Sequence, residues 1–127
     1  MTLNDETKPI YVQIAEWLEN EILNGNFKPN EKVYSQYQLA EIFTVNPATA
    51  AKGLNLLVQE NLLYKKRGLG MFVTNHAKDL ILEKRKSHTL KRLVYELVIE
   101  AKRLNVSEDE LINMIHKVSE DVKGESK

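Results

Sequence analysis

Four basic residues fall in the central segment of this chain, and three of them directly precede the sequence Gly68-Leu69-Gly70. Lysine and arginine bind DNA phosphates and guanine edges, and glycines let a backbone approach a ligand closely. The net charge of the whole chain is zero, so the local distribution of charge matters more than the sum. The cluster predicts contact with nucleic acid. Its members are Lys52, Lys65, Lys66 and Arg67.

The first of these lysines falls on a predicted helix from Pro47 to about Glu60, with Asn46 as its N-cap. The helix begins with small residues, which let its N-terminus approach base edges closely. Thr49 can hydrogen-bond to a base or a phosphate, and Lys52 can reach a phosphate or a guanine edge. Two further small side chains can touch a thymine methyl group: Ala48 and Ala51.

A shorter helix is predicted immediately before this one. Ser35 is a good N-cap, and Leu39, Ala40, Ile42 and Phe43 give the helix an apolar face. The backbone N–H groups at its start favour a phosphate. A tight turn at Thr44-Val45 then leads into the next helix. The residues expected to contact phosphate here are Ser35, Gln36 and Tyr37.

The other basic residues fall in a predicted β-hairpin. Leu62–Tyr64 and Met71–Val73 have the pattern of two strands, and residues 65–70 form a flexible basic tip between them. Arg67 could enter a minor groove while Gly68 and Gly70 let the backbone lie close. The order helix, turn, helix, hairpin is that of a winged helix-turn-helix, which places one helix in a DNA major groove.

Other elements flank this motif. Apolar spacing predicts a helix over residues 9–24, a loop from Asn26 to Lys32 and a very short strand at Val33-Tyr34. We therefore expect a winged helix-turn-helix domain over residues 8–75 and a helical dimerisation region of two to three helices over residues 76–123. The fold class is mainly α with a small β-hairpin.

The helical region is expected to break near Ser87-His88-Thr89, with Thr89 as a new N-cap, and to end at Asn105. A capping box formed by Ser107 and Glu110 then begins a further helix. Together these helices carry more apolar surface than a small hairpin can hide. A second copy of the chain would bury it; the alternative is packing against the first helix of the same chain. The residues expected at a dimer interface are Leu90, Leu93, Val94, Leu97, Val98, Ala101, Leu111, Ile112, Ile115 and Val118.

Composition narrows the function further. The chain has 127 residues, no cysteine and no apolar run long enough to span a membrane. We expect a cytoplasmic protein without disulfides. His76, His88 and His116 are scattered, so no metal site is expected. No phosphate-binding loop, nucleophile elbow or acid pair is present, which argues against an enzyme and predicts no cofactor. No motif specifies a small-molecule effector, and Trp17 and Tyr11 suit packing.

Several separated motifs resemble the N-terminal domain of GntR-type bacterial transcription regulators over about residues 8–75. They are Pro9-Ile10-Tyr11 with Gln13-Ile14, Ile22-Leu23 with Gly25, Lys28-Pro29, Ser35 with Leu39-Ala40, Val45-Asn46-Pro47 with Thr49, and Arg67-Gly68 with Gly70 and Phe72-Val73. The segment from Asn46 to Lys52 and the short helical remainder resemble the YtrA subfamily, whose members dimerise through a helical tail.

This resemblance implies a homodimer that binds a palindromic operator on double-stranded DNA, usually as a repressor, often of its own operon and of ABC transporter genes. It places DNA contacts at Ser35, Tyr37, Asn46, Pro47, Ala48, Thr49, Ala51, Lys52, Arg67 and Gly68. This chain departs from the family pattern where an acid–arginine pair is replaced by Gln36-Tyr37 and early arginines by Pro47 and Ala51. We therefore expect DNA binding by this chain to depend more on Lys52, on the β-hairpin (the wing) and on dimerisation.

A rival hypothesis is a protein-interaction adaptor that uses a winged helix without binding DNA. The neutral overall charge and the missing arginines support it. The two hypotheses differ in the salt dependence of binding to duplex DNA, which an adaptor would lack.

Overall fold

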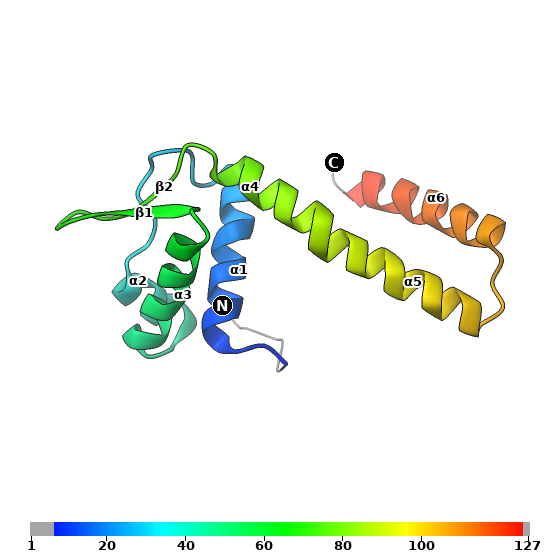
Figure 1. Cartoon of the computed structure of the whole chain (residues 1–127), viewed down its shortest axis with the longest axis horizontal. Coiled ribbons are helices and arrows are strands. Elements are labelled where there is room, and N and C mark those ends of the chain that lie inside the picture. Colours follow the sequence, from blue (N-terminus) through cyan, green and yellow to red (C-terminus); the bar gives the residue numbers. More distant parts are fainter. Residues whose placement is uncertain (1–6, 126–127) are drawn as a thin grey trace. The chain divides into compact units, whose positions relative to one another are not determined.

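The computed structural model describes residues 7–125 (Figure 1). The chain is mainly helical, with one two-stranded antiparallel hairpin, as the sequence predicts. It divides into two compact units, which we call the head (residues 7–84) and the tail (residues 85–125). The elements in order are α1 (Ile10–Leu23), α2 (Gln36–Phe43), α3 (Pro47–Gln59), β1 (Leu63–Lys66), β2 (Gly70–Val73), α4 (Ala77–Lys84), the π-helical segment η1 (Arg85–Leu90), α5 (Lys91–Arg103) and α6 (Glu108–Glu125).

The two helices of the helix-turn-helix begin at side-chain caps. Ser35 Oγ accepts a hydrogen bond from the Gln38 backbone N–H at 3.1 Å, and Gln38 Oε1 accepts one from the Ser35 N–H at 2.9 Å. The Asn46 side chain accepts from the Ala48 N–H at 2.8 Å. The predicted N-caps Ser35 and Asn46 are therefore confirmed, and each satisfies N–H groups that a helix start leaves unpaired.

The head is built around α1, which packs against α3 and α4, while α2 packs against α3. Its largest fully buried side chains come from each of these elements and from the hairpin: Ile14, Leu18, Leu39, Leu57, Leu62, Val73 and Ile81. Because Ile81 of α4 belongs to this core, the head as folded continues past the hairpin. Figure 1 shows these helices together, with the hairpin projecting from them.

Gly53 explains how closely α1 and α3 approach. It lies inside α3, where glycine normally weakens a helix by roughly 1 kcal/mol relative to alanine. A Cβ atom at this position would lie 2.9 Å from the Tyr11 carbonyl oxygen. The missing side chain therefore lets the backbone of α1 pack directly on α3.

Aromatic side chains close one side of the head. The Trp17 ring meets the Phe43 ring edge-on, with centroids 5.2 Å apart, and lies 6.0 Å from the Tyr34 ring. Tyr34 in turn meets Phe27 edge-on at 5.4 Å. Edge-to-face contacts at these separations are favourable. Trp17 therefore has the packing role that the sequence predicts.

The hairpin differs from the prediction in its details. The register pairs Leu63 with Val73 at its base and Lys66 with Gly70 at its end. The first strand therefore includes Lys65 and Lys66, and the connecting turn is shorter than the predicted tip of residues 65–70. These two lysines continue the strand because their backbones pair with the chain opposite.

The short strand predicted at Val33-Tyr34 is also displaced. An isolated antiparallel bridge forms one residue earlier, between Lys32 and Phe72. The backbone supports it on both sides, because the Val33 N–H donates to the Met71 carbonyl at 2.9 Å and the Val73 N–H donates to the Glu31 carbonyl at 3.0 Å. The loop before α2 therefore runs along the edge of β2.

An ion cluster joins three elements of the head. The Lys84 ammonium, at the end of α4, lies 2.7 Å from a carboxylate oxygen of Glu19 in α1 and 2.8 Å from one of Glu60, the residue that ends α3. Glu19 is 3% exposed. Burial lowers the pKa of Lys84, but the hydrogen bonds and attraction from the two carboxylates outweigh it, so that the pKa is raised above its ordinary value.

The predicted break in the tail at residues 87–89 is wrong. Residues 85–90 form a π-helical segment, and Leu90, immediately before α5, has helical dihedral angles and no side-chain cap. A wider helical turn keeps the backbone paired, so Thr89 does not begin a new helix. The predicted end at Asn105 and start at Ser107 are confirmed: Asn105 has a φ of 56°, and Ser107 Oγ accepts from the Glu110 N–H at 3.2 Å.

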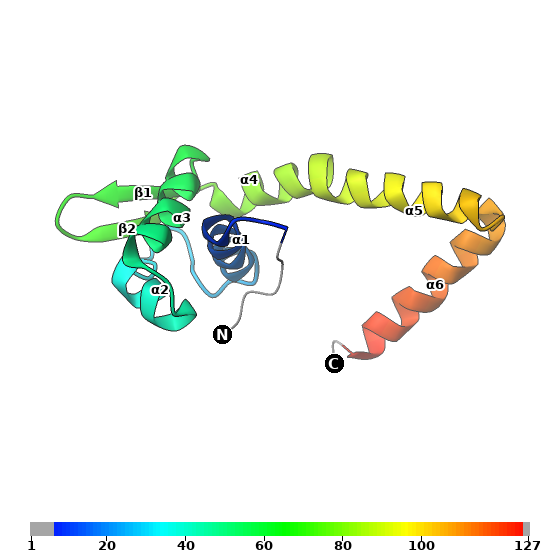
Figure 2. The same cartoon turned by 90° about the horizontal axis from the view of Figure 1, so that it is seen from below.

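The tail leaves many apolar side chains exposed. Figure 2 shows α6 turning back sharply after α5 and diverging from it. An open groove of about 550 Å³ lies between them, lined by Leu97 of α5 and by side chains of α6 that include Ile115, Val118 and Val122. On α5, Ala101 differs from the exposed apolar residues, because it is buried within its own chain, with 7% of its surface exposed.

Candidate nucleic-acid interface

One face of α3 is turned to solvent while the other is in the core. Ala50 and Leu57 are fully buried, whereas Ala48 and Lys52 are exposed. Thr49 and Ala51 are half-buried at the edges of the exposed face, and Pro47 is half-buried at the first helical position beside the exposed cap Asn46. The structure thus presents a helix start with small side chains and one cation, which suits approach to base edges.

Sequence reasoning missed Asn55 on this face. It is exposed, and it lies one turn beyond Ala51 and two turns beyond Ala48. An asparagine carboxamide can pair with adenine, so Asn55 is a further candidate for base reading on the same helix. Helical spacing from Ala48 was the signal that could have found it.

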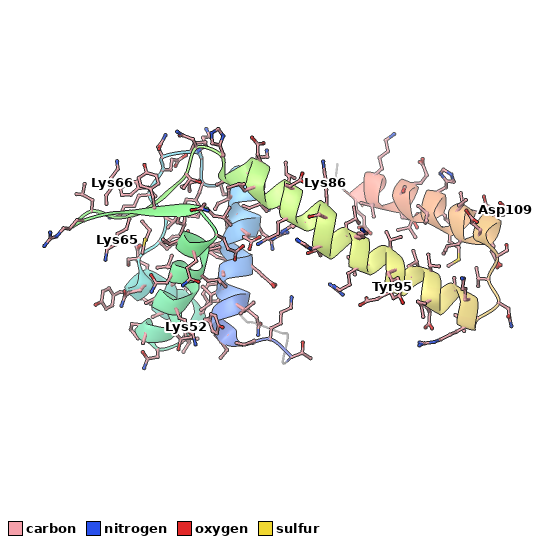
Figure 3. The ribbon with its side chains drawn as sticks, in the orientation of Figure 1. Lys52, Lys65, Lys66, Lys86, Tyr95 and Asp109 are labelled. Atoms are coloured by element: carbon pink, nitrogen blue, oxygen red, sulfur yellow. The ribbon has the colours of Figure 1, made fainter. Side chains whose placement is uncertain are left out.

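Lys52 has a defined position. Its ammonium lies 4.3 Å from the centroid of the Tyr11 ring, which comes from the start of α1. A cation over an aromatic face is attracted by the ring quadrupole. Figure 3 shows Lys52 on α3 next to α1. Tyr11 is half-buried, and its ring packs beneath the lysine at the junction of the two helices.

The start of α2 lies on the same domain and carries the predicted phosphate contacts. Ser35 and Gln36 are half-buried, and Tyr37 is 69% exposed. A helix start aims backbone N–H groups and the positive end of the helix dipole outward, which favours an anion. The Tyr37 hydroxyl adds a neutral donor where the family pattern has an arginine.

The wing separates two lysines that are neighbours in sequence. Lys65 pairs with Met71, on the face that also carries the buried Leu63 and Val73, whereas Lys66 pairs with Gly70 on the opposite face. Figure 3 shows Lys65 and Lys66 on opposite sides of the hairpin. Successive residues of a strand point to opposite faces. The two lysines therefore cannot act as one patch.

The turn of the wing holds its remaining predicted contacts. Arg67 and Gly68 are exposed, and Leu69 is 60% exposed. Gly68 has a φ of 77° and Gly70 a φ of 115°, which only glycine adopts without strain. The glycines therefore shape the turn, and Arg67 extends from it into solvent.

Neither a metal site nor a membrane-spanning helix occurs among the described residues. Within residues 7–125, no three histidine or acidic side chains gather in a way that could hold a metal ion. None of the helices in that part of the chain has the length and apolar character needed to cross a membrane.

Comparison with known proteins identifies the family. Residues 10–73 match the sequence model described as "Bacterial regulatory proteins, gntR family". The chain belongs to this family. The match spans α1, the helix-turn-helix and the wing, which are the elements that build the surface described above.

Two curated relatives extend the likeness. The chain is 34% identical over 119 residues to the HTH-type transcriptional repressor YtrA of Bacillus subtilis (strain 168), covering 94% of this chain and 91% of that protein. It is 39% identical over 75 residues to the HTH-type transcriptional repressor NagR of the same organism, covering 58% of this chain and 31% of NagR. The likeness to YtrA therefore includes the tail, and the likeness to NagR is confined to part of each chain.

Solved structures agree. A GntR family transcriptional regulator from Listeria monocytogenes superposes with a TM-score of 0.72 at 27% identity, covering 89% of this chain and 97% of that one. The DNA-binding domain of AraR in complex with operator ORX1 superposes with a TM-score of 0.55 at 29% identity, covering 58% of this chain and 95% of that one. This chain is a DNA-binding, YtrA-like regulator of the GntR family with a winged helix-turn-helix, and it is not an enzyme.

Proposed function

We propose that this protein is a homodimeric cytoplasmic repressor that binds a palindromic operator through two heads joined by their tails. The observation that carries the proposal is the exposed face of α3 beside a basic wing, within a head that matches the gntR family over residues 10–73. A winged helix-turn-helix places its second helix in the major groove and its wing beside it.

The reading roles divide by element. On α3, Thr49 and Lys52 make polar contacts with bases or phosphates, and Ala48 and Ala51 contact thymine methyl groups. Asn55 adds a contact to adenine. The remaining predicted residues position the head on the backbone: Ser35, Gln36, Tyr37, Asn46, Pro47, Lys65, Lys66, Arg67, Gly68 and Gly70.

The dimer is proposed from the apolar surface of the tail. On α5, Leu93 is 48% exposed and Val94 is 52% exposed, and on α6 Val118 is 58% exposed. Burying apolar area is worth roughly 25 cal/mol per Å², so exposed apolar side chains on both helices favour packing against a second copy. The interface residues proposed are Leu90, Leu93, Val94, Leu97, Val98, Leu111, Ile112, Ile115 and Val118. Ala101, which the sequence also placed there, is buried within its own chain and is left out of the proposed interface.

A two-fold dimer presents two α3 helices to DNA and favours half-sites about 10 bp apart, or a multiple of that spacing. We propose that the regulated genes are its own operon and those of an ABC transporter, from the resemblance to the YtrA-like subfamily. The DNA upstream of its own gene is therefore the first probe to use.

The test is a titration of the full-length protein against that DNA, with random duplex as competitor, at two salt concentrations. We expect saturable binding that survives the competitor and weakens steeply with salt. Lys52→Ala and Arg67→Ala should each weaken binding, by about 1–3 kcal/mol where a base contact is lost, and leave the thermal unfolding midpoint unchanged.

The matched control is Lys78→Ala, which removes one exposed lysine of α4. It should bind as the parent does. If Lys52→Ala and Arg67→Ala also bind as the parent does, the assigned reading surface is wrong. Binding that is absent at low salt would favour the protein-interaction adaptor, whose support is the neutral net charge.

A further inference from the structure

The wing carries a second cation that comes from outside the hairpin. We call the side opposite the buried Leu63 and Val73 the outer wing face; the hairpin register places Tyr64, Lys66, Gly70 and Phe72 on it. Lys32, from the loop before α2, forms the bridge with Phe72 at the edge of this face. It lies 34 positions before Lys66 in the sequence, so only the folded hairpin brings the two together.

Gly70 provides the space for the Lys32 side chain. A Cβ atom on Gly70 would lie 2.8 Å from Lys32 Cε, 3.7 Å from Cδ and 3.7 Å from Nζ. The stem of Lys32 therefore crosses the backbone of β2 where a side chain is missing. Gly70 is also the partner of Lys66 in the register, so both lysine side chains reach the same rung of the hairpin.

Aromatic rings hold the other lysine at this rung. The Lys66 ammonium lies 4.5 Å from the Phe72 ring centroid and 5.8 Å from the Tyr64 ring centroid. These two rings stack across the strands with centroids 5.9 Å apart, and the Tyr64 hydroxyl donates to Asn30 Oδ1 at 2.9 Å. Cation–π contact and packed methylene groups restrict a lysine before it binds, so less side-chain entropy is lost on binding.

The acid closest in sequence to Lys32 is turned elsewhere. Glu31 accepts a hydrogen bond from the Lys28 N–H at 3.1 Å. Among the residues that the structure describes, neither Lys32 nor Lys66 forms a salt bridge with a carboxylate. Two like charges at one rung repel each other, and an anion placed between them would relieve that repulsion.

We propose that Lys32 is a further DNA-contacting residue, and that Lys32 and Lys66 together clamp one backbone phosphate on the outer wing face. The inference rests on the proposed function, because it takes the wing to lie along DNA. A phosphate contact positions the protein and carries no sequence information. Lys32 should therefore contribute equally to binding of operator and of unrelated duplex.

The experiment compares Lys32→Gln, Lys66→Gln and the double variant with the full-length parent. Two short duplexes serve as probes, one selected by the parent from randomised DNA and one with the same bases shuffled. Dissociation constants are measured over a series of NaCl concentrations. We expect Lys32→Gln to weaken both duplexes by the same factor. It should also reduce the slope of log K against log [salt] by up to about 0.9 per protomer, because Lys66 still faces the shared phosphate.

Three comparisons make the result specific. Lys32→Arg keeps the charge and should keep the parent slope. Lys78→Gln removes an exposed lysine of α4, which lines a different cavity with Ile22 and Phe27, and should also keep it. Because the two lysines share one phosphate, the double variant should lose less than the sum of the single losses.

Two outcomes would overturn the assignment of Lys32 alone. In the first, the parent binds DNA, and Lys32→Gln binds with the same affinity and the same slope of log K against log [salt]. The other is a loss confined to the selected duplex, since that would indicate a base contact. A parent that binds neither duplex would instead overturn the proposed function, and the clamp with it.

Discussion

The head and the tail bury their apolar side chains in different ways. In the head, Leu18 and Leu57 are fully buried inside one chain, whereas in the tail Leu93 and Val94 of an amphipathic helix are about half exposed. The head has helices that cross one another and a hairpin that closes the core. The tail has two helices that diverge after a turn. The head therefore buries its apolar side chains within one chain, whereas the exposed apolar face of the tail is the basis for the proposed dimer.

The largest expected effect comes from placing charge on the exposed apolar face of α5. The double variant Val94→Asp with Leu97→Asp should be a monomer, because a carboxylate is costly to bury at an apolar interface. Losing the link between two heads should weaken operator binding by roughly 100- to 10,000-fold. Sedimentation velocity measures the oligomeric state, and a binding titration measures the affinity.

Lys117→Asp is the matched control, because Lys117 lies on the polar side of α6, away from Ile115. It should leave the oligomeric state unchanged. A double variant that still sediments as the parent does would contradict the proposed interface and leave the contrast between head and tail without its explanation.

The next largest effect is on the stability of the head, compared with that of the tail. Leu57→Ala removes a fully buried side chain and should lower the free energy of unfolding by about 3 kcal/mol. Leu104→Ala, at a residue 65% exposed in the tail, should cost less than about 0.5 kcal/mol. Urea denaturation of the two variants gives both numbers; equal losses would contradict the separation of the two regions.

The ion cluster at the end of the head predicts a smaller effect. Lys84→Met should destabilise the head by about 2 kcal/mol, because Glu19 is buried; the partial exposure of Lys84 keeps the loss below that of a fully buried pair. Lys78→Met, at an exposed lysine of the same helix, is the control. Urea denaturation followed by circular dichroism measures both.

The same cluster predicts a pH dependence. The pKa of Lys84 is raised above 10.5 in the folded head, so its stabilisation is fully present below 10.5 and is lost as the pH rises through the folded value. The difference in unfolding free energy between the parent and Lys84→Met should therefore shrink above pH 10.5. A difference that stays constant across this window would show that the charge of Lys84 is not the source.

The smallest effect concerns the side chain that holds Lys52. Tyr11→Leu removes the ring beneath its ammonium and should weaken operator binding by about 0.5–1 kcal/mol. Tyr11→Phe keeps the ring and should bind as the parent does. If the Leu and Phe variants bind equally, the ring does not position Lys52. The comparison shows whether DNA binding by Lys52 depends on its contact with the Tyr11 ring, outside the buried core of the head.

Much of the head could be predicted from local sequence. Ser35 and Asn46 were expected as caps and are caps, because a cap bonds to an N–H only two or three residues away. The break expected near Thr89 is wrong for a related reason: a capping residue type does not start a helix when the backbone on both sides stays helical. A capping residue type therefore predicts a helix start reliably only where no continuing helix already pairs the same backbone N–H groups.

The candidate site was predicted less evenly. Lys52 and Arg67 are exposed as expected, while Asn55 was missed although helical spacing placed it on the same face. Lys65 and Lys66 were expected in a flexible hairpin tip, but they continue the strand, and its alternation puts them on opposite faces of the wing. A shift of one residue in a strand changes the face, so this distinction depends on knowing where the strand ends.

By itself, the sequence determined the order of the main elements, the caps at Ser35 and Asn46 and the apolar face of each helix, because these depend on contacts within a few residues. The tertiary structure alone decided which distant groups meet: Gly53 against the backbone of α1, Lys84 between Glu19 and Glu60, and Lys32 over Gly70. Such contacts join residues far apart in the chain. No local pattern specifies them, since they depend on how the packed elements cross and on the register of the hairpin.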